Sequence, residues 1–367
     1  MAAKVTPDET FKRVPTNAER VIAHLREQGS FCTAYGSPFT GQLLERFADD
    51  VESDGAVAPL VANWPSNPRA AVVGLRLAGA LHAAVLTRRD AALAAAYPQN
   101  DAGWSMGKVW PLARAFIARE ADWVRDFLQF APQTNETRRS IALLAAFLAF
   151  AEQWRGPVDM LEIGASAGLN LNWDRFRYET QSWSWGDVSP VVIDTDWRGP
   201  PPATTYALDI RSRAACDLNP LDIRNEAECL RLKSYIWPDQ PDRLARFDGA
   251  VALALANDVR VDRANAEAWL REKLANRTPG AATLIYHSVF LQYPPRDVRE
   301  AIVCAIREAG ANATLEAPLA WVRLEPEAVT DGAHNGLRFV IDLHTWPGGE
   351  RRILGYTDGH VRAVYAQ

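Results

Sequence analysis

The feature that most constrains the fold is an abrupt change of pattern at Gly156-Pro157. Directly after it, Val158–Ile163 is a short apolar segment that predicts a β-strand, and Gly164–Gly168 is a loop of small residues. The next segment, Leu169–Arg175, predicts the first turns of a helix. A strand, a glycine-containing loop and a helix in succession are typical of the start of an α/β sheet.

The residues before this change predict helices and loops. Apolar positions within Phe39–Val51 recur with helical spacing, and Pro68 and Pro111 stand near the starts of further helices. Thr137–Trp154 predicts a deeply buried helix, because its apolar side chains lie on more than one face. We therefore expect a helical N-terminal region over residues 1–155.

After the change, strand candidates alternate with helical segments, which predicts a mainly parallel sheet. The strand candidates are 177–179, 190–194, 206–210, 259–261, 283–289 and 315–322. Near the end of the chain, Leu337–His344 and Arg351–Tyr356 flank a Pro-Gly-Gly turn and predict an antiparallel hairpin, with a third strand at Val361–Tyr365. We expect one α/β domain over 156–367, with a helical insertion near 220–256.

Composition limits the classes of partner. The chain of 367 residues has a net charge of -5, so it offers no basic field for nucleic acid or for an anionic membrane. Its four cysteines are too far apart for a CxxC element, and its histidines lack HxxxH spacing, so no metal site is predicted. No apolar leader or membrane span is recognisable. We expect a cytoplasmic protein whose partner is a small molecule.

The segment with the clearest chemical signal is the loop after the first predicted strand. Glu162 ends that strand, and Gly164 and Gly168 permit positive φ or close approach of a ligand to backbone N–H groups. The same five residues, with Ser166 at the centre, also match the G-x-S-x-G nucleophile elbow of α/β-hydrolases. A third possibility is a glycine-rich turn that only shapes the fold.

The loop resembles the first motif of Rossmann-like S-adenosylmethionine-dependent methyltransferases, E/D-x-G-x-G-x-G, with Ser166 in place of the middle glycine. The resemblance implies a methyltransferase-type sheet that ends in an antiparallel hairpin, as this chain is expected to have. It implies S-adenosylmethionine as cofactor. The residues expected to bind this cofactor at the loop are Glu162, Gly164, Ser166, Gly168 and Asn170.

Several short stretches spread along the chain form a specific set. They are Thr134-Asn135-Glu136, Glu162 to Leu171, Asp174 to Tyr178, Pro220-Leu221-Asp222, Trp237 to Gln240, His287-Ser288-Val289 and Trp346 to Gly349. Through these stretches the chain resembles, over nearly its full length, a bacterial family catalogued as domain of unknown function 2332. That family has no activity to carry over, and its fold is regarded as methyltransferase-like.

The methyltransferase resemblance implies further site residues. Glu179, after the predicted second strand, would bind the ribose diol, and Asp262 would meet the adenine; Asp262 also fits a simple helix N-cap. His287, at the end of the fourth strand, would act as general base, with Tyr293 lining the same pocket. His287 equally fits a hydrogen-bonded core histidine. Trp237–Gln240 predicts a loop over the cleft.

The leading hypothesis is S-adenosylmethionine-dependent methyl transfer to a small or medium-sized acceptor. One alternative is a protein that binds a nucleotide-like ligand without catalysis. The other is a serine hydrolase with Ser166 as nucleophile and Asp258 and His287 as partners. The hydrolase hypothesis is disfavoured because about 155 helical residues precede Ser166 and no HGG-type oxyanion segment is present.

Overall fold

The computed structural model describes residues 15–330 and 338–367, and the chain divides into two compact units. Unit 1 holds the described residues up to Pro132 together with Lys233–Pro241. Unit 2 holds Gln133–Leu232 and Asp242–Gln367. The sequence suggested a boundary at residue 155, whereas the compact units divide at 132. The chain also leaves unit 2 once, to contribute Lys233–Pro241 to unit 1.

Unit 1 is helical. A capping box between Thr16 and Glu19 begins the first helix, which continues through Gly29. A Cβ at Gly29 would lie 3.0 Å from the Gly41 carbonyl oxygen, so the glycine lets the first two helices approach closely. The helices are α1 (Asn17–Ala34), α2 (Pro38–Glu52), α3 (Ala58–Val61), α4 (Val73–Leu86), α5 (Ala91–Ala96), α6 (Met106–Arg119) and α7 (Ala121–Leu128).

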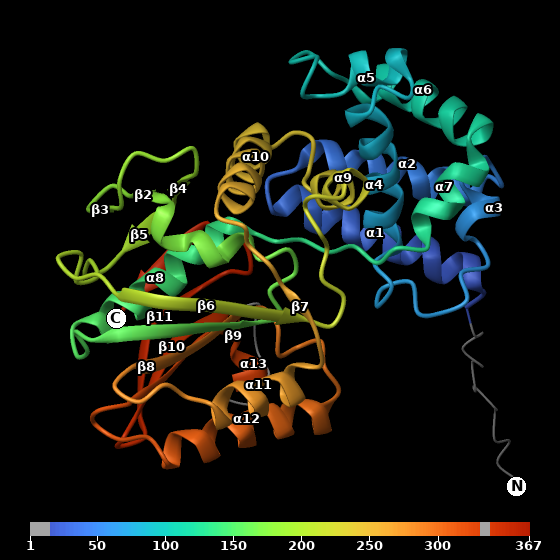
Figure 1. The fold of residues 1–367 in the computed structure, drawn as a ribbon. Helices are drawn as coiled ribbons and strands as arrows, with labels where there is room; N and C mark the ends of the chain where they lie inside the picture. Colours follow the sequence, from blue (N-terminus) through green and yellow to red (C-terminus); the bar gives the residue numbers. More distant parts are fainter. Residues whose placement is uncertain (1–14, 331–337) are drawn as a thin grey trace, which may run out of the picture. The chain divides into compact units, whose positions relative to one another are not determined.

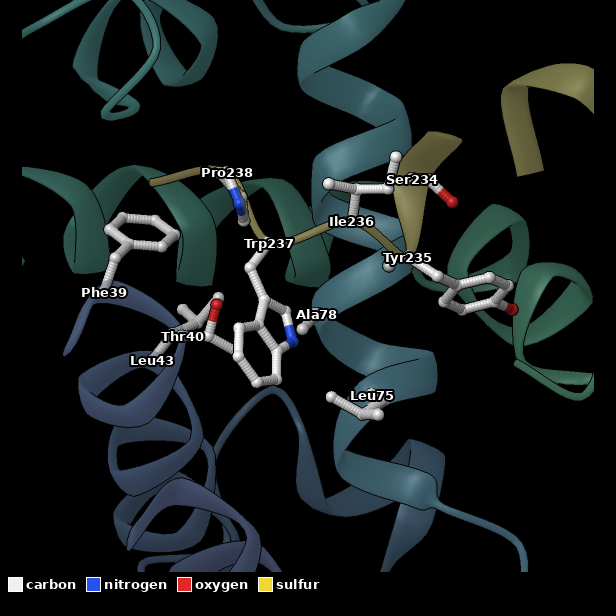
Figure 2. A pocket seen from close by; sticks show the side chains of 11 residues that line it. Phe39, Thr40, Leu43, Leu75, Ala78, Ser234, Tyr235, Ile236, Trp237 and Pro238 are labelled. Atoms are coloured by element: carbon white, nitrogen blue, oxygen red, sulfur yellow. The ribbon is translucent and has the colours of Figure 1, made fainter. Parts of the chain in front are cut away.

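The segment Lys233–Pro241, called the strap below, completes the core of unit 1. Trp237 is buried and packs beside Phe39 and Leu43 of α2, next to a pocket of about 10 Å³ (Figure 2). A Cβ at Gly79 of α4 would lie 2.6 Å from the Tyr235 ring, so this glycine makes room for that ring. The strap therefore adds aromatic side chains to the core of unit 1.

Hydrogen bonds connect the strap to the helices of unit 1. Asp239 accepts a hydrogen bond from the Ser37 hydroxyl at 2.5 Å and one from the Phe39 N–H at 2.9 Å, at the start of α2. The His82 ring nitrogen Nδ1 lies 3.0 Å from the Ser234 carbonyl oxygen. A carboxylate at a helix N-terminus also interacts favourably with the helix dipole.

We predict that Asp239→Ala lowers the free energy of unfolding by about 1–3 kcal/mol, because it leaves a helix-start N–H and a buried hydroxyl without their acceptor. Urea unfolding followed by Trp fluorescence measures the change. The matched control is Gln240→Ala, which removes a half-buried side chain of the same strap and its exposed hydrogen bond to the Gly36 carbonyl oxygen, so a smaller loss is expected. Equal midpoints for the two variants would contradict a role for the Asp239 carboxylate.

Unit 2 is a mixed α/β fold built on a large sheet. Its strands follow the order β5-β12-β11-β10-β9-β8-β1-β6-β7, and β3, β2 and β4 form a separate small sheet. The strands are β1 (Pro157–Ile163), β2 (Arg177–Glu179), β3 (Ser184–Trp185), β4 (Val192–Asp194), β5 (Asp196–Arg198), β6 (Asp209–Asp217), β7 (Asp262–Arg263), β8 (Ala282–Ser288), β9 (Leu319–Pro326), β10 (Phe339–Trp346), β11 (Glu350–Thr357) and β12 (Ala363–Ala366).

The predicted mainly parallel sheet and the predicted C-terminal hairpin are both confirmed. The central strands β6, β1, β8 and β9 run parallel, and β10 and β11 pair antiparallel. The remaining segments of the unit are η1 (Thr137–Arg139), α8 (Ser140–Ala151), η2 (Leu169–Arg175), α9 (Glu226–Ser234, which ends in the strap), α10 (Pro241–Ala256), α11 (Ala266–Ala275), α12 (Arg296–Ala311) and α13 (Glu327–Thr330).

Helices cover both faces of the sheet. Leu161, Ile285 and Trp321 point to the face covered by α11 and α12, which lie side by side (Figure 1). Because side chains alternate along a strand, Glu162 and Tyr286 point to the opposite face. There the Tyr286 ring meets Phe147 of α8, with ring centroids 5.2 Å apart. Within the described residues, no helix combines the length and apolarity needed to cross a membrane.

Candidate functional site

The parallel strands create one position where chain connections diverge. In chain order, β1, β6, β7, β8 and β9 occupy the spatial order 3-2-1-4-5, so the connections lead to opposite sides of β1. Ligands of open α/β sheets bind outside the carboxyl ends of the strands at such a switch point. Here the switch point lies between β1 and β8, where Glu162 pairs in register with Tyr286. The loop after β1 therefore stands where a ligand is expected.

The loop itself is held in a left-handed backbone conformation. Gly164, Ser166 and Gly168 have φ values of 67°, 56° and 73°. The Ser166 N–H donates to Asp217 Oδ2 at 2.8 Å, and the Leu169 N–H donates to Asn135 Oδ1 at 2.9 Å. The segment after the loop, Leu169–Arg175, was predicted as the first turns of a helix and forms the 3-10 helix η2.

The two glycines of the loop lie against protein side chains. A Cβ at Gly164 would lie 2.7 Å from Cγ of Phe290, and a Cβ at Gly168 would lie 2.8 Å from side-chain atoms of Val259 and Val261. Glycine is therefore required at both positions by packing as well as by φ. The Phe290 ring covers the Gly164 side of the loop.

We predict that Gly164→Ala lowers the free energy of unfolding by about 2–5 kcal/mol, the sum of left-handed strain and overpacking against Phe290. The matched control is Gly280→Ala, at φ 78° with nothing within 4 Å of the added Cβ, where only the strain of about 1 kcal/mol applies. Chemical denaturation of both variants measures the difference. Equal losses of stability in the two variants would mean that the Phe290 ring moves aside at no cost in free energy.

Three carboxylates lie on the first three parallel strands, close to where the strands end or begin. Glu162 of β1 is buried and accepts a hydrogen bond from the Tyr286 hydroxyl at 3.2 Å. Burial raises the pKa of Glu162 to about 8, and nearby Asp217 adds to the rise. Asp217 ends β6 and is half-buried, and Asp262 begins the adjoining strand β7, opposite Cys216. The Trp269 indole N–H donates to Asp262 Oδ2 at 2.8 Å.

The structure places Glu179 away from these carboxylates. Glu179 ends β2 in the small three-stranded sheet, where it is exposed and pairs with Arg177 at 3.1 Å. The strand beside β1 is β6, so the acid that follows the second strand of the large sheet is Asp217. Asp217 was not among the residues expected to bind the cofactor, although it directly follows the apolar run Ala214-Ala215-Cys216.

His287 is hydrogen-bonded through both of its ring nitrogens. It is fully buried, its Nδ1 lies 2.6 Å from Glu325 Oε1, and its Nε2 accepts the Trp321 indole N–H at 3.0 Å. Because an indole N–H only donates, Nε2 carries the lone pair and Nδ1 carries the proton. Both ring nitrogens are thus engaged, and neither is left to act as the general base that the sequence suggested. Tyr293 is 74% exposed on the loop after β8.

Glu325, which sequence reasoning missed, anchors the loop that carries Phe290. Its Oε1 accepts the Phe290 N–H at 2.8 Å and the Leu291 N–H at 3.2 Å, besides the His287 contact. Glu325 is fully buried at the end of β9. The position of the Phe290 ring on the loop after β1 therefore depends on this carboxylate.

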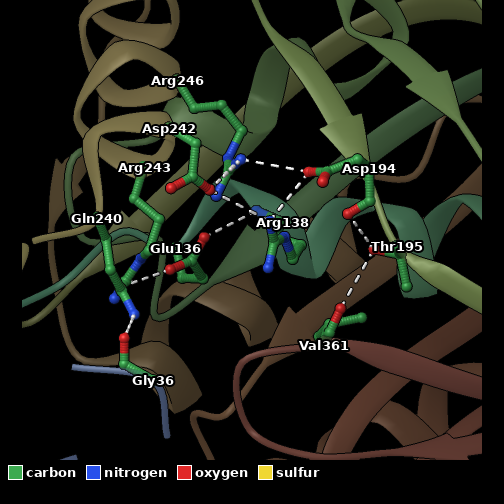
Figure 3. A network of polar contacts seen from close by, with 10 residues as sticks. All are labelled: Gly36, Glu136, Arg138, Asp194, Thr195, Gln240, Asp242, Arg243, Arg246 and Val361. Atoms are coloured by element: carbon green, nitrogen blue, oxygen red, sulfur yellow. Dashed lines mark hydrogen bonds and ion pairs between the residues drawn. The ribbon is translucent and has the colours of Figure 1, made fainter. Parts of the chain in front are cut away.

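The segment before α8 reaches the same loop. Asn170 donates from Nδ2 to the Glu136 carbonyl oxygen at 3.4 Å, and Glu136 pairs with Arg243 at 2.6 Å (Figure 3). Burial alone raises the pKa of Glu136, but Arg243 and the Arg138 N–H lower it to about 2. Glu136 is therefore an anion that orders the residues beside Asn170.

Buried polar atoms without partners occur at this site. Ser166 Oγ and Asn170 Oδ1 belong to buried residues, and neither atom has a hydrogen-bond partner. Because buried polar groups in native proteins are nearly always bonded, such atoms indicate a place for a polar ligand or water. Residues 15–330 and 338–367 contain no group of three Asp, Glu, His or Cys side chains suited to a metal ion.

The hydrolase partners do not come together. Ser166 Oγ has no hydrogen bond to His287, whose nitrogens bind Glu325 and Trp321. Asp258 is an exposed residue that pairs with Arg224 at 2.6 Å and with Arg260 at 2.9 Å. The described residues thus show no Ser-His-Asp relay around Ser166.

Comparison with known proteins gives a family without an assigned chemistry. No curated protein and no solved structure matches the chain. A family model described as an uncharacterized protein conserved in bacteria, domain of unknown function 2332, matches residues 23–365 and so spans both units. The chain belongs to this bacterial family.

Proposed function

We propose that this protein is a Rossmann-like S-adenosylmethionine-dependent methyltransferase that acts on a small or medium-sized acceptor. The observation that carries the proposal is the arrangement of three carboxylates, Glu162, Asp217 and Asp262, on the neighbouring strands β1, β6 and β7, of which β1 borders the switch point. Carboxylates in such positions accept hydrogen bonds from a ribose diol and favour a cationic ligand.

The residues at the loop fit a nucleoside with a charged end. Asp217 is half-buried and lies beside the Ser166 N–H, so it offers acceptor oxygens to a ribose diol at the same edge. The unpartnered Ser166 Oγ and Asn170 Oδ1 offer further polar contacts. Since Phe290 covers Gly164, the ligand is proposed to approach from the side of Ser166 and Asn170.

The cofactor, when bound, supplies an activated methyl group on a sulfonium. The protein's own contribution is then to orient donor and acceptor and to exclude water. Glu162 favours the cation once it is deprotonated, because opposite charges attract strongly in a buried site. His287 sets the position of the loop after β8 through Glu325, so it acts as a positioning residue and not as a proton acceptor.

We predict that Asp217→Asn weakens binding of S-adenosylhomocysteine by about tenfold to 150-fold, because charge-assisted hydrogen bonds contribute about 1.5–3 kcal/mol. Isothermal titration calorimetry measures the dissociation constant. The matched control is Glu179→Gln, which changes the exposed acid that the sequence had suggested for the same role and should leave the constant unchanged. Absence of heat with the wild-type protein at millimolar ligand would refute the proposal, and so would equal effects of the two variants.

A second candidate, binding of a nucleoside-like ligand without catalysis, is favoured by one observation. His287, the base expected from the sequence, has both ring nitrogens engaged. Mass spectrometry of a cell extract incubated with the protein and S-adenosylmethionine separates the candidates. A methyltransferase converts the cofactor to S-adenosylhomocysteine in the presence of acceptor, whereas a binding protein returns it unchanged.

A further inference from the structure

Unit 2 contains an open cavity beside its small sheet. The cavity has a volume of about 340 Å³, at the lower end of the range of about 300–1,000 Å³ for small-molecule sites. Every described side chain of its lining is polar or charged: Arg138, Glu179, Thr180, Gln181, Asp194, Thr195, Asp196 and Arg362. Since ligand sites are mostly apolar, a wholly polar lining indicates a small hydrophilic ligand.

Arg138 of this lining and the neighbouring Arg246 share two carboxylate oxygens. Arg138 Nη2 lies 2.9 Å from Oδ1 of Asp194 and 3.4 Å from Oδ2 of Asp242. Arg246 Nη1 lies 3.3 Å from the same Asp194 oxygen and 3.0 Å from the same Asp242 oxygen (Figure 3). Each guanidinium therefore makes both of these ion pairs through a single nitrogen.

Three further donors of these two guanidiniums lack an acceptor. Arg138 Nε, Arg246 Nε and Arg246 Nη2 are buried and have no hydrogen-bond partner, and the Arg246 side chain is only 6% exposed. The two Arg246 nitrogens form one complete edge of the planar group, and such an edge binds a carboxylate through two parallel hydrogen bonds. Because buried donors in native proteins are nearly always bonded, this pair of arginines has room for further acceptor atoms.

The acids already present do not supply these acceptors. Burial lowers the pKa of Arg246, and the like charge of Arg138 adds to this shift. Glu136, Asp242 and Asp194 oppose the shift but do not reverse it. These acids counter the charge of the two arginines, while three of the nitrogen donors still have no partner. The pair therefore lacks acceptor atoms rather than negative charge.

The charges of the lining also limit the charge of the ligand. The lining carries three carboxylates and two guanidiniums, so a purely anionic ligand would meet more like than opposite charge. A purely cationic ligand would leave the buried guanidinium donors without acceptors. Arg138 and Arg246 both contact Oδ1 of Asp194, which leaves Oδ2 of this exposed carboxylate for a cationic group. A ligand with one carboxylate and one ammonium group meets both requirements.

We propose that this cavity binds a free α-amino acid, with the ligand carboxylate on the guanidinium of Arg138 and the ligand ammonium group on Asp194. These two recognising groups adjoin, 2.9 Å apart, and the two charged groups of an α-amino acid likewise share one carbon atom. Once the ligand occupies Arg138, the Asp242 carboxylate is left to Arg246, so both guanidiniums gain acceptors. None of the described lining residues belongs to the loop after β1, so this site stands independently of the proposed function.

Isothermal titration calorimetry of the full chain with each common L-amino acid at millimolar concentration tests the site. The amino acid that binds most tightly is then compared with its primary amide, which lacks the carboxylate, and with its N-acetyl form, which lacks the ammonium group. The cavity variants are Arg138→Gln and Asp194→Asn. Their matched controls, Arg260→Gln and Asp258→Asn, change the two members of an exposed ion pair outside the cavity lining. Circular dichroism verifies that each variant is folded.

We expect the amide, the N-acetyl form and each cavity variant to weaken binding by at least about tenfold, and the controls to leave the dissociation constant unchanged. The two ligand derivatives need only the wild-type protein, so they decide the matter even if a cavity variant does not fold. Absence of binding by every amino acid overturns the proposal, and so does undiminished affinity of either derivative or an equal effect of the cavity variants and the controls. S-adenosylhomocysteine takes no part in these titrations, so their failure leaves the proposed function standing.

Discussion

Glu325→Ala is expected to lower the free energy of unfolding by about 3–5 kcal/mol, the range for breaking a buried pair of polar groups. The substitution leaves the His287 Nδ1–H and the N–H groups of Phe290 and Leu291 without their acceptor in a dry environment. Such unsatisfied donors carry the full cost of desolvation. Urea unfolding measured by circular dichroism gives the change.

Two further variants make the Glu325 result specific. Glu325→Gln retains an acceptor oxygen and should lose much less stability than the alanine variant. Glu300→Ala removes a glutamate whose ion pair with Arg296 is exposed, so the unfolding midpoint should stay where it is. A small effect of Glu325→Ala would show that the loop after β8 keeps its position without this carboxylate.

Glu162→Gln is expected to stabilise the protein at alkaline pH by about 3–6 kcal/mol and to have little effect near pH 4.5. The carboxyl of Glu162 has a pKa of about 8 in the folded chain and 4.5 as the ordinary value. Between these values the unfolded chain releases a proton that the folded chain retains. Stability of the wild type therefore falls as pH rises from 4.5 to 8, while a neutral glutamine escapes this loss and still accepts from Tyr286.

Denaturant midpoints at several pH values from 5 to 9 test this pattern. Asp159→Asn, on the same strand, is the control. Burial opposes ionisation of Asp159, but Arg211 and Ser212 outweigh it and lower its pKa. Its contribution is thus complete above the ordinary pKa and is lost only in acid, so this variant should shift all midpoints from pH 5 to 9 by a constant amount. If the denaturant midpoints of the wild type and of Glu162→Gln changed with pH in parallel, the pKa of Glu162 would have its ordinary value.

The first strand of the large sheet and its loop were predictable because their signals are local. Val158–Ile163 was expected as a strand and β1 begins one residue earlier, at Pro157. A mainly apolar run is typical of a strand buried on both faces, and β1 is such a strand although Asp159 and Glu162 interrupt its apolar residues. The loop after it was recognised from small residues alone, and three of its five residues have positive φ.

The second strand of the large sheet, β6, could not be predicted from the sequence, because its charged residues obscure the apolar pattern of a strand. Along β6, Arg211 pairs with Asp159, and Arg213 forms two hydrogen bonds with Asp174, at 2.6 Å and 2.7 Å. These partners lie far away in sequence, so an arginine in a half-buried strand is indistinguishable locally from one in a loop. The Arg177–Glu179 segment is a strand, as expected, but it belongs to the small sheet.

The sequence likewise did not indicate where the strap packs. Trp237–Gln240 predicted a loop over the cleft, whereas Trp237 lies in the core of unit 1 and Asp239 contacts Ser37 and Phe39 at the start of α2. In the sequence, Asp239 is 202 positions away from Ser37 and 200 positions away from Phe39. Only tertiary structure reveals a pairing at that separation.

The strap has a consequence for how the protein can be dissected. A truncated gene that stops at Pro132 encodes every helix of unit 1 and yet leaves Phe39 and Leu43 facing solvent where Trp237 should stand. Faithful isolation of that unit calls for a chimera in which a flexible spacer joins Pro132 to Lys233. In the intact chain, synthesis of the helical unit finishes only after the ribosome has translated Gln133–Leu232 of its neighbour.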